Sequence, residues 1–161
     1  EECASGLAGA YAKGLTHRDI KPTNILIASQ GVSKLVDFGL AEISTQGGSV
    51  SLQRQSEKDD DVAVDRTVDY AGLEKATGMK PGDVRSDIYF LGTVLYEMVT
   101  GEPLMPVTKD KQARMAARRY QEVEDTLAKG GPAHGLPAEL QRLIARMVAY
   151  DIRAGERVVF G

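Results

Sequence analysis

The sequence predicts a mainly α fold of the α+β class, in which a bundle of helices surrounds one small β-hairpin. Residues 86–100 carry apolar side chains around most of a helical circumference and end at a glycine, which is typical of a buried helix. Residues 109–129 and 137–150 also have helical periodicity. Two short apolar runs flank a turn between residues 25 and 36, and this pattern indicates the hairpin.

The overall composition excludes several classes of protein. The chain has 161 residues, 42% of them hydrophobic, which is enough for one domain with a core. A net charge of −3 gives no general case for a nucleic-acid partner. No apolar run reaches the roughly 18 residues of a membrane span. The single cysteine, Cys3, excludes an internal disulfide. We therefore expect a cytoplasmic location, although the full-length protein could be tethered to a membrane.

The chain opens with the end of a helix. Apolar residues recur at helical spacing over residues 1–14, and Gly14 stands where a left-handed residue would end the helix.

The predicted hairpin gathers polar side chains at one end. Its strands are residues 25–27 and 35–36, joined by a turn over residues 28–31. Because a hairpin returns the chain to its starting point, the polar residues before the first strand and after the second should converge. These residues are Asp19, Lys21, Asn24 and Asp37. Carboxylate and amide oxygens of this kind suit Mg²⁺, which prefers one or two carboxylates plus phosphate oxygens.

Two motifs in this region resemble those of eukaryotic-type protein kinases. Residues 17–24 read His-Arg-Asp-Ile-Lys-Pro-Thr-Asn, like the kinase catalytic loop, and residues 37–39 read Asp-Phe-Gly, like the magnesium-binding motif. Asp37 follows Asn24 by thirteen residues, with the hairpin pattern between them. The combination is far more specific than either motif alone, and it resembles the bacterial serine/threonine kinases.

The resemblance implies a role for each polar side chain of the site. Asp19 would accept or orient the proton of the substrate hydroxyl, and Lys21 would offset charge on the transferred phosphoryl group of ATP. Asn24 and Asp37 would hold Mg²⁺ (or Mn²⁺) against the nucleotide phosphates. Lysine at position 21 is typical of the serine/threonine kinases. A decayed site that retains these residues is the alternative.

Other residues of the two motifs would support the site. His17 would hold the loop in shape without titrating, and Phe38 and Gly39 complete the magnesium motif. Arg18 implies an activation segment controlled by phosphorylation, because a guanidinium can pair bidentately with a phosphate.

The activation segment would span residues 37–74. Residues 40–66 are rich in polar residues and glycine without periodicity, so we expect a solvated, mobile loop. Thr67 matches the kinase threonine that contacts the catalytic aspartate and lysine and seats the substrate. Glu74 matches the glutamate of the kinase Ala-Pro-Glu motif, and its ion-pair partner would be Arg157, or alternatively Arg153.

One departure from the family lies in this motif. Residues 72–74 read Gly-Leu-Glu. The missing proline removes a rigid turn and puts the local backbone, not the chemistry, in question.

The helix over residues 86–100 would be the central helix of the kinase large lobe. Ser86 is its expected N-cap, Asp87 lies in its first turn and Gly101 follows its end. The resemblance implies that Asp87 hydrogen-bonds the backbone of the catalytic loop and holds Asp19 in place. A role as a simple helix cap is the alternative for Asp87.

The helix over residues 109–129 carries three basic residues, Arg114, Arg118 and Arg119. We interpret them as a solvated helix face, with a docking site as the alternative. Pro137 opens the last helix, which we expect to run to about Tyr150.

The resemblance covers nearly all of residues 1–157, and residues 1–161 are therefore expected to be a partial kinase domain, the C-terminal lobe. No glycine-rich phosphate loop precedes residue 17, so we expect the small N-terminal lobe to be missing from these residues and to lie upstream of them. The expected function is transfer of the ATP γ-phosphoryl group to serine or threonine hydroxyls of proteins, with the isolated fragment inactive. The alternative is a pseudokinase or lone lobe that binds other proteins without catalysis. The sequence does not specify an oligomeric state.

Overall fold

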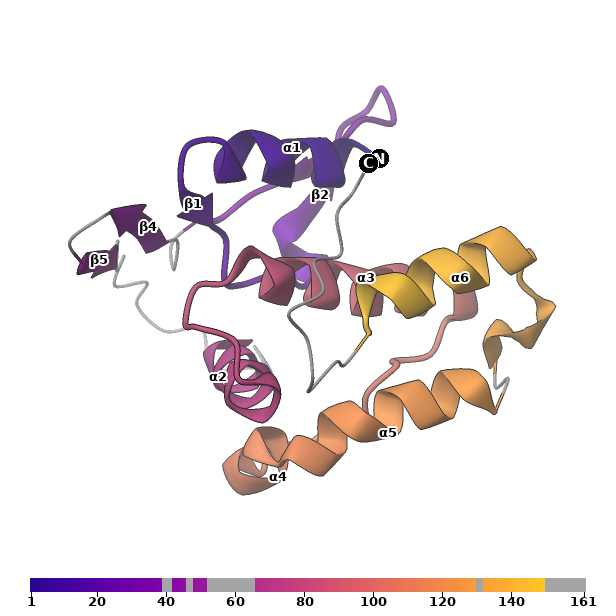
Figure 1. Ribbon diagram of the computed structural model, residues 1–161. Coiled ribbons are helices and arrows are strands. Elements are labelled where there is room, and N and C mark those ends of the chain that lie inside the picture. The colour runs from indigo at the N-terminus through magenta and orange to yellow at the C-terminus, as the bar shows by residue number, and fades with distance from the viewer. Residues whose placement is uncertain (39–41, 46–47, 52–65, 130–131, 150–161) are drawn as a thin grey trace.

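The computed structural model describes residues 1–38, 42–45, 48–51, 66–129 and 132–149. The elements along the chain are α1 (Glu2–Tyr11), β1 (Leu15–Thr16), the 3₁₀ turn η1 (Pro22–Asn24), β2 (Ile25–Ile27), β3 (Ser33–Leu35), β4 (Glu42–Thr45), β5 (Gly48–Ser51), α2 (Arg66–Thr77), α3 (Val84–Thr100), α4 (Lys111–Met115), α5 (Ala117–Ala128), the 3₁₀ turn η2 (Pro132–Gly135) and α6 (Ala138–Met147). Helices dominate and the sheets are small (Figure 1), which confirms the predicted fold class.

Helix α3 is the centre of the structure. It lies between α1 and α5 in Figure 1 and packs against α2 and α6. Its N-cap is Asp83, whose side chain accepts a hydrogen bond from the Arg85 amide, so the prediction of Ser86 as the cap was wrong by three residues. Asp87 lies in the first turn and Gly101 ends the helix with φ 76°, both as predicted. Asp83 takes the cap because it follows the turn at Gly82, which has φ 78°.

Strands β2 and β3 form the predicted antiparallel hairpin. Ile25 pairs with Leu35 and Ile27 with Ser33. The Val36 amide then donates to the Asn24 carbonyl at 2.9 Å, which continues the pairing to the end of the loop over residues 17–24. Asp37 is therefore one residue beyond the point where the two chain segments meet.

The segment after the hairpin contains strands that the sequence did not indicate. β4 pairs with β1 and β5 pairs with β4, all antiparallel, with Leu15 opposite Ile43. The prediction of residues 40–66 as loop throughout was therefore wrong for residues 42–45 and 48–51. The Ser- and Gly-rich composition hid these strands, because pairing with distant residues overrides local propensity.

The predicted helix over residues 109–129 is two helices. Ala116 is extended, with ψ 127°, and separates α4 from α5. Both helices pack against α2. The break turns the Arg114 carbonyl toward the Tyr120 hydroxyl, which donates to it at 2.8 Å.

The terminal helices are shorter than predicted. α1 ends at Tyr11 with Ala12 as its C-cap. Gly14, with φ 73°, is therefore the second residue after the cap and not the first, as predicted. α6 ends at Met147, before the predicted Tyr150. Within the described ranges, no helix combines the length and the apolar character needed to cross a membrane.

A hollow of about 810 Å³ lies among α1, the hairpin, α3 and α6. Its lining is mostly apolar and includes Leu7, Ile27, Met98 and Leu143. None of the predicted catalytic or metal-binding residues lines it. The hollow is therefore separate from the candidate active site.

Candidate active site

Asp19 lies at the centre of a compact polar cluster. The Lys21 ammonium is 2.8 Å from Asp19 Oδ2, and the Asn24 side-chain amide donates to the same oxygen at 3.0 Å and to the Asp19 carbonyl at 2.8 Å. Asp19 is 6% exposed. The structure thus brings three of the four predicted side chains into direct contact. Charge-assisted contacts of this kind fix the orientation of the carboxylate.

The His17 ring links the loop over residues 17–24 to the end of the hairpin. Its Nδ1 accepts from the Asp19 amide at 3.2 Å, and its Nε2 lies 3.0 Å from the Val36 carbonyl. These partners require a neutral ring with the proton on Nε2. Burial lowers the pKa of His17 and favours this neutral form. The ring also contacts Phe38, with centroids 4.4 Å apart, so the two motifs pack against each other.

Asp87 receives hydrogen bonds from several directions. Its carboxylate accepts from the His17 amide at 2.8 Å and from the Arg18 amide at 2.9 Å. The hydroxyls of Tyr70 and Tyr11 donate to it at 2.8 and 3.3 Å. The side chain is 0% exposed. Asp87 therefore holds the backbone of the loop over residues 17–24, in addition to lying in the first turn of α3.

Tyr70 is a member of this network that the sequence analysis missed. Its hydroxyl accepts from the Ile20 amide at 3.2 Å while donating to Asp87. Burial raises the pKa of Tyr70 well above its ordinary value, and the Asp87 charge adds to the shift. The phenol therefore remains a donor. The available signal was a tyrosine three residues after Thr67.

The residues predicted to hold a metal ion, Asn24 and Asp37, lie at the same end of the hairpin, before its first strand and after its second. Asn24 is buried at the end of η1, and Asp37 is exposed with φ 64°. The Asn24 amide nitrogen faces Asp19, so its oxygen is the atom available to a cation. Throughout the described part of the chain, no group of three or more His, Cys, Asp or Glu side chains could hold a metal. The donor set fits Mg²⁺ only with phosphate oxygens completing its coordination.

Glu74 and Arg18 lie near one another. The Arg18 guanidinium is 3.9 Å from Glu74, and the Glu74 carboxylate also accepts from the Gly82 amide at 3.0 Å. The predicted partner of Glu74, Arg157, lies outside the described residues, as do the alternative Arg153 and the motif residue Gly39. Arg18 thus approaches a carboxylate in this structure.

Thr67 lies in the first turn of α2 with an exposed side chain. Further along this helix, Gly72 departs from the family motif for a physical reason. A Cβ at Gly72 would collide with the Tyr120 hydroxyl and lie 2.7 Å from the Arg114 carbonyl. Glycine therefore permits α2 to approach α4 and α5 closely.

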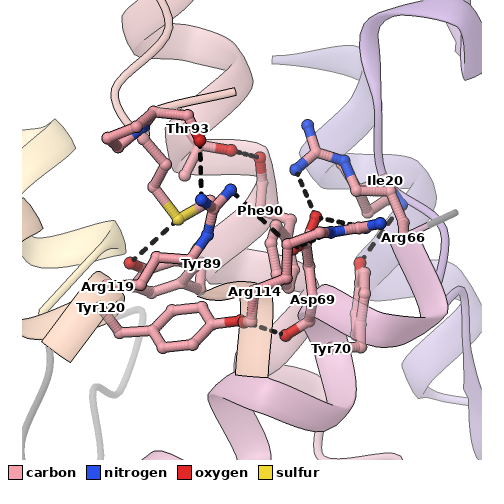
Figure 2. A network of polar contacts seen from close by, with 12 residues as sticks. Ile20, Arg66, Asp69, Tyr70, Tyr89, Phe90, Thr93, Arg114, Arg119 and Tyr120 are labelled. Atoms are coloured by element: carbon pink, nitrogen blue, oxygen red, sulfur yellow. Dashed lines mark hydrogen bonds and ion pairs between the residues drawn. The ribbon is translucent and has the colours of Figure 1, made fainter. Parts of the chain in front are cut away.

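The predicted solvated face of basic residues is wrong for two of its three members. Arg114 forms two hydrogen bonds with Asp69, at 2.9 and 3.0 Å, and is buried. Arg119 reaches the same carboxylate at 3.9 Å (Figure 2). Arg118 alone of the three is exposed, and it pairs with Glu122. The partner, Asp69, lies 45 residues before Arg114, beyond the reach of any helical pattern.

Comparisons with known proteins find a family and relatives for this chain. The family described as "Protein kinase domain" matches residues 1–157. The "Probable serine/threonine-protein kinase PknB" of Bifidobacterium longum is 37% identical over 142 residues, covering 88% of this chain and 19% of that protein. The "Serine/threonine-protein kinase PknB" of Mycobacterium tuberculosis is 37% identical over 149 residues, covering 92% of this chain and 22% of that protein.

A third relative, from Lactococcus lactis, carries the name "Probable serine/threonine-protein kinase PknB". It is 30% identical over 152 residues, covering 94% of this chain and 22% of the relative. The chain therefore spans about a fifth of the length of these curated relatives. The match along nearly the whole chain shows that it belongs to the protein kinase domain family.

Proposed function

We propose that residues 1–161 are the C-terminal lobe of a serine/threonine protein kinase, which transfers the γ-phosphoryl group of ATP to protein hydroxyls in the cytoplasm. Three segments carry the function: the catalytic loop 17–24, the activation segment 37–74 and the central helix, predicted at 86–100 and observed as α3. The names of the relatives favour this substrate class.

Asp19 is the proposed base. Lys21 and Asn24 both contact its Oδ2, which leaves Oδ1 as the oxygen to receive the substrate proton. Lys21 would then offset negative charge on the transferred group, as positioned cations do in phosphoryl transfer. Thr67 would seat the substrate.

Mg²⁺, when bound with ATP, would neutralise phosphate charge during the transfer. Asn24 would supply its carboxamide oxygen and Asp37 its carboxylate. The backbone hydrogen bond between Val36 and Asn24 supports these two ligands, because Asp37 follows Val36 and therefore lies at the same end of the hairpin as Asn24.

The observation that carries the proposal is the buried attachment of the loop to α3. Asp87 binds two consecutive amides of the catalytic loop, and the second precedes Asp19 by one residue. A carboxylate held in this way can act through positioning, which supplies much of the catalysis in phosphoryl transfer.

The decisive experiment measures phosphorylation of a generic basic protein by the complete gene product with ATP and Mg²⁺. Asp19→Asn should lower the turnover by about 10²- to 10⁴-fold, the usual contribution of a positioned base. The matched control is Asp125→Asn, which changes an exposed aspartate of α5 in the same way. Wild-type turnover in Asp19→Asn would refute the proposal.

A non-catalytic interaction module is the second candidate, favoured by the altered Gly72-Leu73 motif. Titration of the 161-residue chain with Mg²⁺-ATP in a calorimeter tests the lobe proposal directly. We expect weak binding or none, because part of the nucleotide cleft would come from a small lobe. Micromolar binding would show that this view of the cleft is wrong. An inactive complete protein would favour the module.

A further inference from the structure

A second polar site lies where α2, α4 and α5 meet. The carboxylate of Asp69, at 0% exposure, faces three arginines (Figure 2). Arg114 binds it at 2.9 and 3.0 Å, Arg66 lies 3.3 Å from it and Arg119 lies 3.9 Å from it. We name Arg66, Arg114, Arg119 and Asp69 the arginine cluster.

The arginine cluster carries more positive charge than its carboxylate can balance. Three guanidinium groups and one carboxylate leave an excess of two positive charges in a largely buried place, because arginine keeps its proton in proteins. Buried charge is costly unless it is paired and hydrogen-bonded. The excess therefore points to a group beyond the four side chains.

The hydrogen bonding of the arginine cluster is also incomplete. Arg119 donates to the Pro106 carbonyl at 2.7 Å, and the Arg66 guanidinium lies 5.4 Å from the centre of the Phe90 ring. The Nε–H groups of Arg66 and Arg119 are nevertheless buried without an acceptor among the residues that the structure describes. The side chain of Arg119 is only 10% exposed, so bulk water does not satisfy it.

The arginine cluster adjoins the catalytic loop. Tyr70, the residue after Asp69, accepts a hydrogen bond from the Ile20 amide, and Ile20 follows Asp19 (Figure 2). Arg66 also precedes Thr67 directly in the sequence. An anion held by the cluster would therefore lie beside the segments that a polypeptide substrate meets.

We propose that the arginine cluster binds a phosphoryl group carried by a serine, threonine or tyrosine side chain of a polypeptide. Such a group bears close to two negative charges at neutral pH and three acceptor oxygens. It would match the excess charge and supply acceptors for the unpaired Nε–H groups, whereas a single carboxylate matches only half of the charge. The phosphorylated residue belongs either to a protein substrate or to the chain itself.

The inference does not rest on the proposed catalysis. It is tested by binding to the 161-residue chain, so failure of phosphate binding and failure of phosphoryl transfer are separate results. The probe is a short phosphoserine peptide, and its unphosphorylated form is the reference. Fluorescence anisotropy gives the two dissociation constants.

The variants separate specific contacts from general charge. Arg119→Gln and Arg66→Gln should each weaken phosphopeptide binding by at least about tenfold, the loss of one strong contact. Arg118→Gln is the matched control, because it removes the same charge from the neighbouring exposed position of α5. Arg118→Gln should stay within about twofold of the wild type, as a screened surface charge would.

Stability measurements keep the test informative if a variant folds poorly. Arg119→Lys keeps the charge but lacks the planar fork and Nε–H, so it should also bind the phosphopeptide more weakly. The phosphopeptide should raise the melting temperature of the phosphatase-treated wild type. Arg119→Gln alone should not lower the melting temperature, since it removes uncompensated charge.

A comparison of the phosphatase-treated chain with the untreated chain decides the source of the phosphate. If the chain supplies it, phosphatase treatment of the purified chain should create binding that the untreated chain lacks. If a substrate supplies it, treatment should change nothing. Equal affinity of the phosphatase-treated chain for both peptides, or equal losses in Arg118→Gln and Arg119→Gln, would overturn the proposal. So would an Arg119→Gln variant that melts earlier while binding the phosphopeptide normally.

Discussion

Two aspartates of this chain, Asp87 and Asp69, are equally inaccessible to solvent but have opposite surroundings. Asp87 accepts hydrogen bonds from backbone amides and tyrosine hydroxyls, all of them neutral donors. Asp69 faces three guanidinium groups. The Asp87 carboxylate holds two backbone amides in place, whereas the Asp69 carboxylate pairs with several positive charges.

The difference shows what burial of a charge achieves in each place. Neutral donors around Asp87 leave its negative charge in place, near the N-terminus of α3, where the helix dipole favours it. The donors around Asp69 neutralise its charge more than completely. The first arrangement is complete within the chain, whereas the second is complete only with a further anion, as proposed above.

Loss of the Asp69 charge should have the largest effect on stability. Asp69→Asn leaves three arginines without their counter-ion, and we expect a loss of about 3 to 5 kcal/mol in the free energy of unfolding. Urea denaturation of the 161-residue chain measures it, with Asp125→Asn as the exposed control. A loss below about 1 kcal/mol would mean that the arginines are already compensated by another group.

Loss of the Asp87 charge should cost somewhat less. In Asp87→Asn one acceptor oxygen becomes a donor, so at least one of the buried donors loses its partner. We expect a decrease of about 2 to 3 kcal/mol in the free energy of unfolding, measured in the same way. An effect larger than that of Asp69→Asn would reverse the comparison.

Acid should weaken the Asp87 region through His17. Burial lowers the pKa of His17, so as the pH falls the unfolded chain binds a proton at a higher pH than the folded chain does. This stability is present above the ordinary histidine pKa of about 6.5 and is lost as pH falls below it, by at most about 1.4 kcal/mol per pH unit. Urea denaturation between pH 7.5 and 5 measures the slope.

His17→Gln should reduce that slope, and His134→Gln serves as the control because it changes the other histidine of the chain. The arginines of the cluster keep their charge throughout this range. An unchanged slope in His17→Gln would show that the pKa of the ring is the same in the folded and unfolded chains.

The smallest effect belongs to an ion pair beside the arginine cluster. Arg118 and Glu122 are 2.6 Å apart, but Arg118 is 85% exposed. Arg118→Ala should lower the free energy of unfolding by only about 0.3 to 0.5 kcal/mol, and high salt should remove the difference. A loss comparable with that of Asp69→Asn would mean that exposure does not govern these pairs.

The sequence predicted the parts of the fold that depend on local patterns. The hairpin and the central helix could be predicted from the spacing of apolar residues, from turn residues and from helix-capping residues, all of which lie within or next to each element. The break at Ala116 and strands β4 and β5 did not follow, because each depends on a distant partner. β4, for example, is a strand because it pairs with Leu15 and Thr16.

In the candidate site too, contacts within one short segment could be predicted and contacts between distant segments could not. The contacts among Asp19, Lys21 and Asn24 were foreseeable because all three lie in one short loop. The Tyr70 hydroxyl and the Asp69 carboxylate reach partners 50 and 45 residues away. The sequence shows the residue types at these positions but not which side chains meet.

The left-handed backbone at Arg18, with φ 63°, has a consequence for how the site can be used. A non-glycine residue in this conformation is strained by about 1 kcal/mol or more, and it persists only where its surroundings hold it. Here the surroundings are the carboxylate of Asp87, on a helix that begins 66 residues later in the chain. A peptide of residues 17–24 alone would relax to other shapes. The loop therefore cannot be transplanted as a linear motif, and any scaffold designed to reproduce it must include the helix that carries its anchor.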